Sequence, residues 1–597
     1  MNKGDGLYMN KPQNNEVPSK MFLMWVPVLI ILFIKSNAVL FSLFSVNTSI
    51  LIYSALTTAP ILFLISFSFI FSQKGQLLYL LGLDFFISIL FIVDIVYARA
   101  YGHLISIYMM IAKDVMEGLS ASVISLMKWT DFLMLIDLPI LFILAVKSKQ
   151  QIRLKKRIHL FYFTILLSLA AICFQFAWLE NSKKLGNYKM HPLLMSPIGN
   201  HMFDLYRFLY EKSDTLDSEG IDKIDFWLKN NEKFQYPNKD YAHMEGILKG
   251  KNLIVIHFES LENIVVNQSY YSQEITPNIN RLLNSSIYFS NIFEQVRDGN
   301  SSDAEFMFNT SVYPLSNGSA FLRFGDNIYA SLPKLLHEEG YTSIAIHGDN
   351  KEFWNRNQVF PFLGFDKFID EEQFNDKRSI GLGILDESLF TQSISEIKKL
   401  KEPYNILIIT ITSHVPFVLD EKDQHLNLPN NNETSAYLQS IHYTDKVFGE
   451  FYDKLKVEGL LQNSVLMLYG DHEGIHKYYP TTTLPDNNHK LPFIIHFPGM
   501  EGFTIDKIGG QVDMMPTAAY LLGIDREKYS STAMGRNILG NTSGSVILPT
   551  GEILGQTDVS EHLTKAQSIA DMIIRGNYFG NSDIFEASKR ENKSLVH

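Results

Sequence analysis

The chain has 597 residues, a formal net charge of −11 and one cysteine, Cys173. The negative charge argues against nucleic acid as a partner. A single cysteine leaves no internal disulfide, so a folded domain must rely on its hydrophobic core, which a chain of this length can build.

Five long apolar stretches lie between residues 21 and 180, near 22–41, 50–72, 77–97, 130–147 and 159–179. Each is close to the roughly 20 residues that a helix needs to cross a bilayer core, so they predict a five-helix transmembrane domain. The connection between the third and fourth, YGHLISIYMMIAKDVMEGLSASVISLM, has many polar interruptions and is expected to lie at the membrane interface. A buried soluble core is the alternative, and the number, length and clustering of the stretches disfavour it.

The loop between the fourth and fifth stretches indicates the orientation. It carries no acid and six basic residues, Lys147, Lys149, Arg153, Lys155, Lys156 and Arg157. Basic loops stay in the cytoplasm, which places the tail 1–20 inside and everything after about residue 180 outside. The tail is polar and no small-residue cleavage site follows a short apolar core, so the first stretch is expected to be an anchor.

The outer half divides into two parts. Residues 181–250 are polar and helix-prone and are expected to form an amphipathic connector, with SPIGNHMFDLYRFLYEK as its most amphipathic piece. From 251 to 597, amphipathic helical patterns alternate with the apolar runs NLIVIHF, TSIAIHG, YNILIITIT, SVLMLYG and FIIHF. This alternation predicts an α/β domain with a mainly parallel central sheet covered by helices on both faces.

Four of these runs end in acids or histidines: Glu259, then His347 and Asp349, then His414, then Asp471 and His472. Ligands of an open α/β sheet bind outside the carboxyl ends of its strands, so these side chains predict a functional site. Two carboxylates and an imidazole, from Glu259, Asp471 and His472, suit Mn²⁺, Mg²⁺ or Zn²⁺. An Asp-His pair alone is often only a turn, and Glu259 on a second strand exit favours the metal.

The segment GNSSDAEF, residues 299–306, offers a hydroxyl nucleophile. Ser302 and Glu305 fit a capping box that opens a helix, which places Ser301 just before the cap, where a phosphate would dock. Beside a divalent cation, Ser301 could ionise and attack phosphorus. The alternative is that both serines only cap the helix.

Six segments together resemble the lipoteichoic acid synthases, the polyglycerolphosphate polymerases of Gram-positive envelopes. They are ESLE (259–262), GNSSDAEF, HGDNKEFWNR (347–356), TSHVPF (412–417), YGDHEGI (469–475) and GGQVDMMPTAAYLLGI (509–524). The resemblance covers nearly the whole chain, including the five stretches and the connector. It implies a five-helix transmembrane domain followed by an extracellular sulfatase-like α/β domain, 251–597, with one Mn²⁺-type metal.

The resemblance also implies roles for individual residues. Glu259, Asp471 and His472 match the metal ligands, and Ser301 stands at the nucleophile, which is also a ligand. The positions that hold glycerol phosphate are matched by His257, His347, Asp349, Trp354, Arg356 and His414. Ser301 replaces the threonine of the family, which keeps the hydroxyl but loses a methyl group and frees the rotamer.

The implied activity is that of a membrane phosphoglycerol transferase. Ser301 would take glycerol phosphate from phosphatidylglycerol and pass it, from a glycerophosphoryl-serine, to a growing chain or a glycolipid anchor. Priming with one unit and polymerisation of many both fit these residues. No small-x-Ala site stands between 180 and 250, so the sequence does not support proteolytic release of the outer domain.

Other functions fit less well. A phosphoethanolamine transferase usually has disulfides in its outer domain, and this chain has no cysteine there. A sulfatase needs Cys- or Ser-x-Pro-x-Arg, whereas Ser301 is followed by Ser-Asp-Ala. A two-metal phosphatase would need further acids and histidines at the strand exits. A non-catalytic paralogue that binds polymer would hold the carboxylates without a cation, at a cost.

Overall fold

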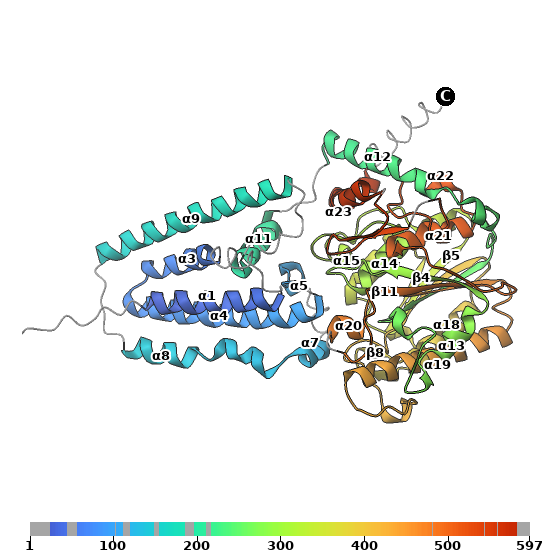
Figure 1. The fold of residues 1–597 in the computed structure, drawn as a ribbon, viewed down its shortest axis with the longest axis horizontal. Coiled ribbons are helices and arrows are strands. Elements are labelled where there is room, and N and C mark those ends of the chain that lie inside the picture. Colours follow the sequence, from blue (N-terminus) through green and yellow to red (C-terminus); the bar gives the residue numbers. More distant parts are fainter. Residues whose placement is uncertain are drawn as a thin grey trace, which may run out of the picture. The chain divides into compact units, whose positions relative to one another are not determined.

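The computed structural model describes residues 24–43, 57–101, 103–111, 120–147, 154–184, 196–210, 216–479, 482–541, 544–557 and 559–581 (Figure 1). The chain forms two compact units. One comprises Met1–Val93 and Trp129–Asn200, and the other comprises Asp94–Lys128 and His201–His597.

The first unit is helical. Its elements include α1 (Trp25–Leu43), α3 (Thr58–Ser66), η1 (Phe67–Ile70), α4 (Gln73–Tyr101, which runs on into the second unit), η2 (Trp129–Leu135), α8 (Leu138–Lys147) and α9 (Leu154–Lys184). Among the described residues, three helices are long and apolar enough to cross a membrane, over Trp25–Ser42, Lys74–Arg99 and Lys156–Gln175. These are the first, third and fifth predicted stretches.

The second and fourth predicted stretches do not reach that length. The apolar helix Thr58–Ile70 is shorter, and residues 50–56 of that stretch lie outside the described residues. The fourth stretch is divided between η2 and α8. Pro139 explains the division, because a proline in the first turn of α8 has no N–H for a preceding turn and its ring would clash with the carbonyl four residues earlier.

A buried ion cluster ties helices of the first unit together. Lys35 Nζ of α1 lies 2.9 Å from Asp84 Oδ1 of α4 and 2.8 Å from Asp137 Oδ1, just before α8. It also donates to Ser88 Oγ at 2.7 Å. Charges inside apolar helices are tolerated when they pair with one another, and this pairing accounts for Lys35, Asp84 and Asp137 within the predicted spans.

A nine-stranded sheet forms the centre of the second unit, in the order β12-β4-β11-β10-β1-β9-β5-β6, with β13 paired to β4. The strands are β1 (Asn252–Phe258), β4 (Ser286–Phe293), β5 (Thr342–His347), β6 (Lys367–Ile369), β9 (Tyr404–Ile409), β10 (Ser464–Gly470), β11 (Lys490–His496), β12 (Phe503–Ile505) and β13 (Gly509–Gly510). Only β11 runs antiparallel to its neighbours on both sides. The predicted, mainly parallel α/β sheet is therefore confirmed.

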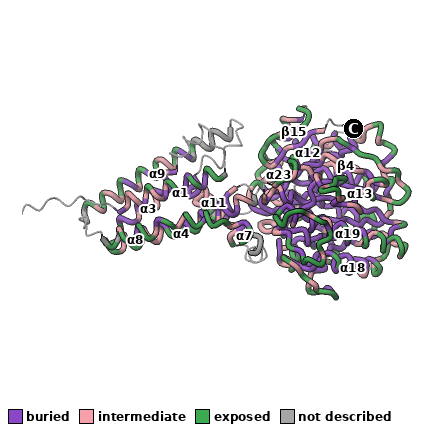
Figure 2. The backbone as a smooth tube through the Cα atoms, turned by 60° about the horizontal axis from the view of Figure 1, so that its bottom comes forward, coloured by how far each residue is buried: buried purple, intermediate pink, exposed green. Residues whose placement is uncertain are grey.

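Helices cover both faces of this sheet. In Figure 1, α13 (Pro277–Leu283), α18 (Asp386–Ile397) and α19 (Glu433–Val457) lie on one side, and α14 (Ser301–Thr310) and α21 (Met514–Leu521) on the other. A large apolar cluster joins strand residues such as Ile256 and Leu468 to Leu438 and Phe448 of α19. Figure 2 shows buried backbone throughout the interior of this unit, with exposed segments on its outside. This packed core needs no disulfide.

Shorter elements complete the second unit. They are α5 (Ile107–Ile111), α7 (Ser120–Leu126), α11 (Pro197–Tyr210, which begins in the first unit), α12 (Ser218–Glu232), α15 (Ala320–Arg323), α16 (Leu332–Glu338), α17 (Arg356–Leu363), α20 (Ile475–Tyr478), α22 (Arg526–Tyr529) and α23 (Ser560–Arg575). Three two-stranded sheets pair β2 (Ser269–Tyr270) with β3 (Gln273–Glu274), β7 (Ser379–Ile380) with β8 (Gly383–Ile384), and β14 (Ser545–Ile547) with β15 (Ile553–Gly555).

His562 joins α12, from the predicted connector, to the C-terminal helix α23. Its ring stacks on Trp227 with centroids 4.1 Å apart, and its Nε2 lies 3.0 Å from Asn231 Oδ1. The Asn231 amide nitrogen donates to three backbone carbonyls, so Oδ1 is the acceptor and His562 Nε2 carries a proton. Burial lowers the pKa of His562 to about 4.

Acid should therefore weaken this junction. The unfolded chain protonates a histidine near pH 6.5, whereas folded His562 resists protonation down to about pH 4. Its contribution to stability is complete above pH 6.5 and decreases as the pH falls towards 4. We expect His562→Phe, which keeps the stacked ring, to flatten the pH dependence of the unfolding free energy between pH 7 and 4.5. The same substitution at exposed His243 should leave that dependence unchanged; an unaltered slope in His562→Phe would contradict the assignment.

Candidate active site

The predicted strand exits are adjacent in the sheet. β1 lies between β10 and β9, and β5 follows β9. His257 of β1 is level with Tyr469 of β10 on one side and with Ile409 of β9 on the other. His347, at the end of β5, is level with the same Ile409. The carboxyl ends of four neighbouring parallel strands thus deliver their polar side chains to one edge, as the sequence predicts.

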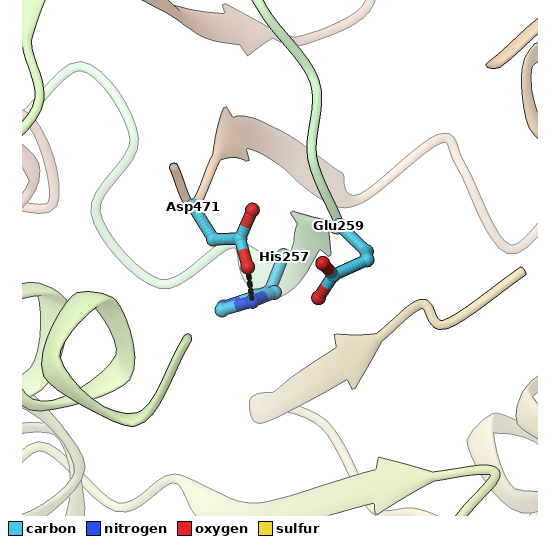
Figure 3. Close-up of side chains that lie close together, drawn as sticks. All are labelled: His257, Glu259 and Asp471. Atoms are coloured by element: carbon cyan, nitrogen blue, oxygen red, sulfur yellow. Dashed lines mark hydrogen bonds and ion pairs between the residues drawn. The ribbon is translucent and has the colours of Figure 1, made fainter. Parts of the chain in front are cut away.

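Three side chains at this edge form a potential metal site. One ligand atom from each of His257, Glu259 and Asp471 lies within 4.8 Å of the others (Figure 3). His257 Nε2 is 3.2 Å from Asp471 Oδ2. The Nε2 atom of His472 is 3.3 Å from Asp471 Oδ2 and 3.4 Å from Glu259 Oε1. All three ligands expected from the resemblance therefore meet, and His257 lies beside them.

The protonation states of these groups fit a divalent cation. Burial, followed by the neighbouring Asp471, raises the pKa of Glu259 well above its usual range. Burial alone would raise the pKa of Asp471 too, but His472 and His257 hold it below its usual value. Two carboxylates in one buried site repel each other unless a cation or proton lies between them. The donor set of carboxylates and imidazole matches Mn²⁺, Mg²⁺ or Zn²⁺.

His472 is in the form that a metal requires. Burial lowers its pKa to about 3, which keeps the ring neutral. Its Nδ1 lies 2.8 Å from the carbonyl oxygen of Glu473, so Nδ1 carries the proton and donates there. The lone pair is then on Nε2, which faces Glu259 and Asp471. A backbone carbonyl that sets the tautomer in this way is the usual support of a metal-binding histidine.

Ser301 is the first residue of α14 and is buried. Its Oγ lies 3.4 Å from Glu259 Oε2 and 3.4 Å from His472 Nε2. The hydroxyl is thus at the start of a helix, where the dipole and the free N–H groups favour an anion. The predicted nucleophile and the predicted metal ligands lie together.

The predicted capping box is wrong. The N-cap is Asn300, and its side chain makes no cap hydrogen bond. Ser302 Oγ instead donates to the carbonyl of Gly299 at 2.6 Å, and Glu305 is engaged by Arg356. The carboxylate of Asp303 accepts from the N–H groups of Arg297 and Gly299 and closes the preceding turn. This closed turn lets the helix begin at Ser301, two residues earlier than the capping box predicts.

Asn300 and Lys477 are site residues that the sequence reasoning missed. Asn300 Nδ2 donates towards His472 Nε2 at 2.7 Å, and its Oδ1 accepts from Lys477 Nζ at 2.7 Å. Lys477 therefore fixes the orientation of the amide, with its N–H groups towards the site. Asn300 follows no strand, so the strand-exit pattern could not find it; its position directly before Ser301 was the available clue.

The substrate-binding candidates at the other strand exits are buried, and the two histidines among them are neutral. Burial and Arg356 lower the pKa of His347 well below its usual value, and burial lowers that of His414. Their Nδ1 atoms lie 2.9 Å from Ile409 O and 2.7 Å from Val415 O, respectively. Burial raises the pKa of Asp349 to about 6, and its Oδ2 has no hydrogen-bond partner among the described residues.

Trp354 and Arg356 are the remaining candidates, and Arg356 has a partner that the sequence did not predict. Trp354 is buried, in a left-handed backbone conformation with φ 57°. Arg356 is 1% exposed and grips the Glu305 carboxylate, with Nη2 2.6 Å from Oε1 and Nε 3.1 Å from Oε2. The fork that was expected for phosphate is thus directed at Glu305 of α14. The pair connects the segment after β5 to the helix that begins with Ser301.

Comparison with known proteins agrees with this geometry. Residues 251–524 match the sulfatase family, and residues 9–215 match the lipoteichoic acid synthase N-terminal domain. The crystal structure of the lipoteichoic acid synthase LtaP from Listeria monocytogenes aligns with a TM-score of 0.51 and 27% identity, over 60% of this chain and 98% of that chain. The sulfatase-like fold of the second unit is thereby confirmed.

Two full-length relatives extend the likeness across both units. Lipoteichoic acid synthase 1 of Bacillus subtilis (strain 168) is 30% identical over 504 residues, which are 80% of this chain and 78% of that protein. Lipoteichoic acid synthase of Staphylococcus aureus (strain USA300) is 33% identical over 473 residues, 74% of this chain and 72% of that protein. The strand exits, the serine at the helix start and these matches agree: the chain belongs to the lipoteichoic acid synthase family.

Proposed function

We propose that this protein is a metal-dependent phosphoglycerol transferase that moves glycerol phosphate from phosphatidylglycerol to a growing lipoteichoic acid chain or its glycolipid anchor. The observation that carries the proposal is the position of Ser301 Oγ, 3.4 Å from both Glu259 Oε2 and His472 Nε2. In this proposal residues 21–180 form five membrane helices. The domain 251–597 works outside the cell, joined by the connector 181–250, and no release by proteolysis is invoked.

Glu259, Ser301, Asp471 and His472 would hold the cation, with Mn²⁺ preferred and Mg²⁺ or Zn²⁺ as alternatives. When bound, such a cation lowers the pKa of a coordinated hydroxyl and neutralises charge on a phosphate oxygen. His257 supports this set through Asp471, because its Nε2 is 3.2 Å from Asp471 Oδ2. Tyr469, whose hydroxyl lies 3.0 Å from His257 Nδ1, orients the ring from the other side.

The first half-reaction forms a bond from Ser301 Oγ to phosphorus and breaks the bond from phosphorus to the diacylglycerol oxygen. The serine proton can rest on Glu259, whose Oε2 is 3.4 Å away, and ends on diacylglycerol. In the second half-reaction a hydroxyl of the acceptor attacks the glycerophosphoryl-serine, and its proton returns to Ser301. The amide of Asn300, oriented by Lys477, holds one N–H group beside the nucleophile, towards His472 Nε2. With His472 Nε2 on a cation, this donor would be available to a phosphate oxygen.

The other strand exits suit the glycerol phosphate. His347 and His414 are neutral and can hydrogen-bond phosphate or glycerol oxygens without a net charge. Asp349 Oδ2 is a buried oxygen without a partner among the described residues, so a glycerol hydroxyl that reached it would satisfy it. Trp354 and Arg356 would close the far side, with Arg356 held by Glu305.

The test uses the full chain in liposomes that contain labelled phosphatidylglycerol and a glycolipid acceptor. We expect diacylglycerol release in Mn²⁺, loss of release after chelation with EDTA, and recovery when Mn²⁺ returns. Length analysis of the product separates addition of one unit from polymerisation. Liposomes that carry phosphatidylethanolamine as the only donor are the matched control and should release no diacylglycerol.

Two results would overturn the proposal in different ways. Release from phosphatidylethanolamine and not from phosphatidylglycerol would identify a phosphoethanolamine transferase. No release from either donor, with no divalent ion bound and no Mn²⁺-dependent rise in melting temperature, would identify a non-catalytic paralogue that binds polymer.

A further inference from the structure

The segment that follows the apolar part of α4 contacts the loop that carries Ser301. His103 Nε2 lies 2.6 Å from Asp298 Oδ1. Asp298 is three residues before Ser301, and both sides of the contact belong to the second compact unit. The sequence predicted only an interfacial connection here, with no role in the reaction.

Asp298 lies in the loop before α14 and connects it to other segments. Its Oδ2 accepts from the N–H of Gly318 at 2.5 Å, and the next residue, Ser319, has its Oγ 2.9 Å from Ser302 Oγ. The residues on both sides of Asp298, Arg297 and Gly299, donate their backbone N–H groups to Asp303 Oδ2 of α14. A displacement of Asp298 would therefore be transmitted to the first turn of α14, where Ser301 stands.

The segment that carries His103 is itself held at a second point. The guanidinium carbon of Arg323, in α15, lies 3.8 Å from the ring centroid of Tyr108. Tyr108 in turn packs edge-on against Phe208 of α11, with centroids 5.4 Å apart, and the N–H of Ile107 donates to Asp204 of the same helix. Residues 103–108 thus contact both α11 and α15.

We propose that His103 is a positioning residue for Ser301: through Asp298 it holds the turn that starts α14, and so couples the juxtamembrane segment to phosphoryl transfer. The inference rests on the proposed function of Ser301. Burial alone would lower the pKa of His103, but Asp298 raises it overall, and His103 in turn lowers the pKa of buried Asp298. The contact is therefore charge-assisted, which makes it shorter and stronger than a neutral hydrogen bond.

If His103 acts by positioning Ser301, its loss should affect turnover rather than binding of the phosphatidylglycerol donor. A nucleophile displaced by about 1 Å can lose on the order of 10²-fold in rate, and loss of one of several supports should cost less. We expect His103→Ala in the full chain to lower kcat for diacylglycerol release about 10-fold and to change KM for phosphatidylglycerol less than about 2-fold. His103→Gln, whose amide can donate to Asp298, should recover part of kcat.

His201→Ala is the matched control. It removes another histidine–aspartate contact of the same unit, 2.9 Å from Asp94, and leaves Asp298 untouched. Its kcat should stay within about 2-fold of the wild type. The decisive measurement is a double-mutant cycle with Asp298→Asn, which keeps an acceptor for Gly318 but removes the charge. In that background His103→Ala should lower kcat by less than about 2-fold.

An unchanged kcat in His103→Ala, an effect on KM alone, or the same loss with and without Asp298→Asn would each overturn the inference. A wild-type enzyme that releases no diacylglycerol from phosphatidylglycerol would instead overturn the proposed function. The two failures are therefore distinguishable.

Discussion

Ser301→Ala should abolish diacylglycerol release from phosphatidylglycerol, with a loss of at least about 10³-fold, because removal of a covalent nucleophile removes the path through the serine intermediate. The side chain is small and makes contacts of 3.4 Å with Glu259 and His472, so the folded structure should survive. Release of labelled diacylglycerol is the measurement, and an unchanged melting temperature confirms that the variant is folded.

Two neighbouring substitutions define what Ser301 contributes. Ser301→Thr introduces the threonine that the family resemblance implies, keeps the hydroxyl and should retain turnover within about 10-fold, because its methyl group mainly restricts the rotamer. Ser302→Ala removes a hydrogen bond to Gly299, with an expected cost of about 1 kcal/mol in stability and only a partial loss of turnover. Full activity in Ser301→Ala would show that Ser301 is not the nucleophile. Complete loss of activity in Ser302→Ala, with Ser301→Ala still active, would point to Ser302 instead.

Arg356→Met should destabilise the second unit strongly. The guanidinium and the Glu305 carboxylate are both fully buried and lie 2.6 Å apart, so truncation of Arg356 strands a carboxylate without its partner. Breaking a buried pair from one side typically costs about 3–5 kcal/mol. The free energy of unfolding by denaturant measures the loss. Lys223→Ala, at an exposed ion pair on α12, is a control that should leave this free energy nearly unchanged.

The double variant Glu305→Met/Arg356→Met separates stability from catalysis. Replacing both charges by apolar side chains removes the stranded carboxylate, and most of the lost stability should return. Turnover should remain at least about 10-fold low, because methionine offers phosphate no hydrogen-bond donor. Recovery of full turnover would show that Arg356 serves only to hold Glu305 and has no role towards phosphate.

The sheet was largely predictable because strands that are buried on both faces appear in the sequence as continuous apolar runs. NLIVIHF and SVLMLYG coincide with β1 and β10, in which every residue is buried. The run from Tyr404 ends earlier than predicted, at Ile409, because the Asp386 carboxylate accepts from the N–H groups of Ile411 and Thr412 and turns the chain. Asp386 is 25 residues from Ile411 in the sequence, so no local pattern could reveal this end.

In the first unit, by contrast, the helices could be predicted only in part from the sequence. Length and apolarity alone identify three helices over the described residues, but the fourth stretch, equally apolar, is divided at Asp137 and Pro139. A hydropathy average over such a stretch does not show where the helix is interrupted within it. The partner of Asp137 is Lys35, about a hundred residues away, and the pairing is a property of the packed helices.

For the site, the residue types could be predicted from the sequence alone. Polar residues that follow buried parallel strands must emerge at one edge, so Glu259, His347, His414, Asp471 and His472 were predictable as a group. The tertiary structure decided the partners. Arg356 faces Glu305, Asn300 is oriented by Lys477, and His103 reaches Asp298 across almost two hundred residues. A strand pattern is periodic and local, whereas the choice of partner for a buried charge depends on which side chains the fold brings within about 3 Å.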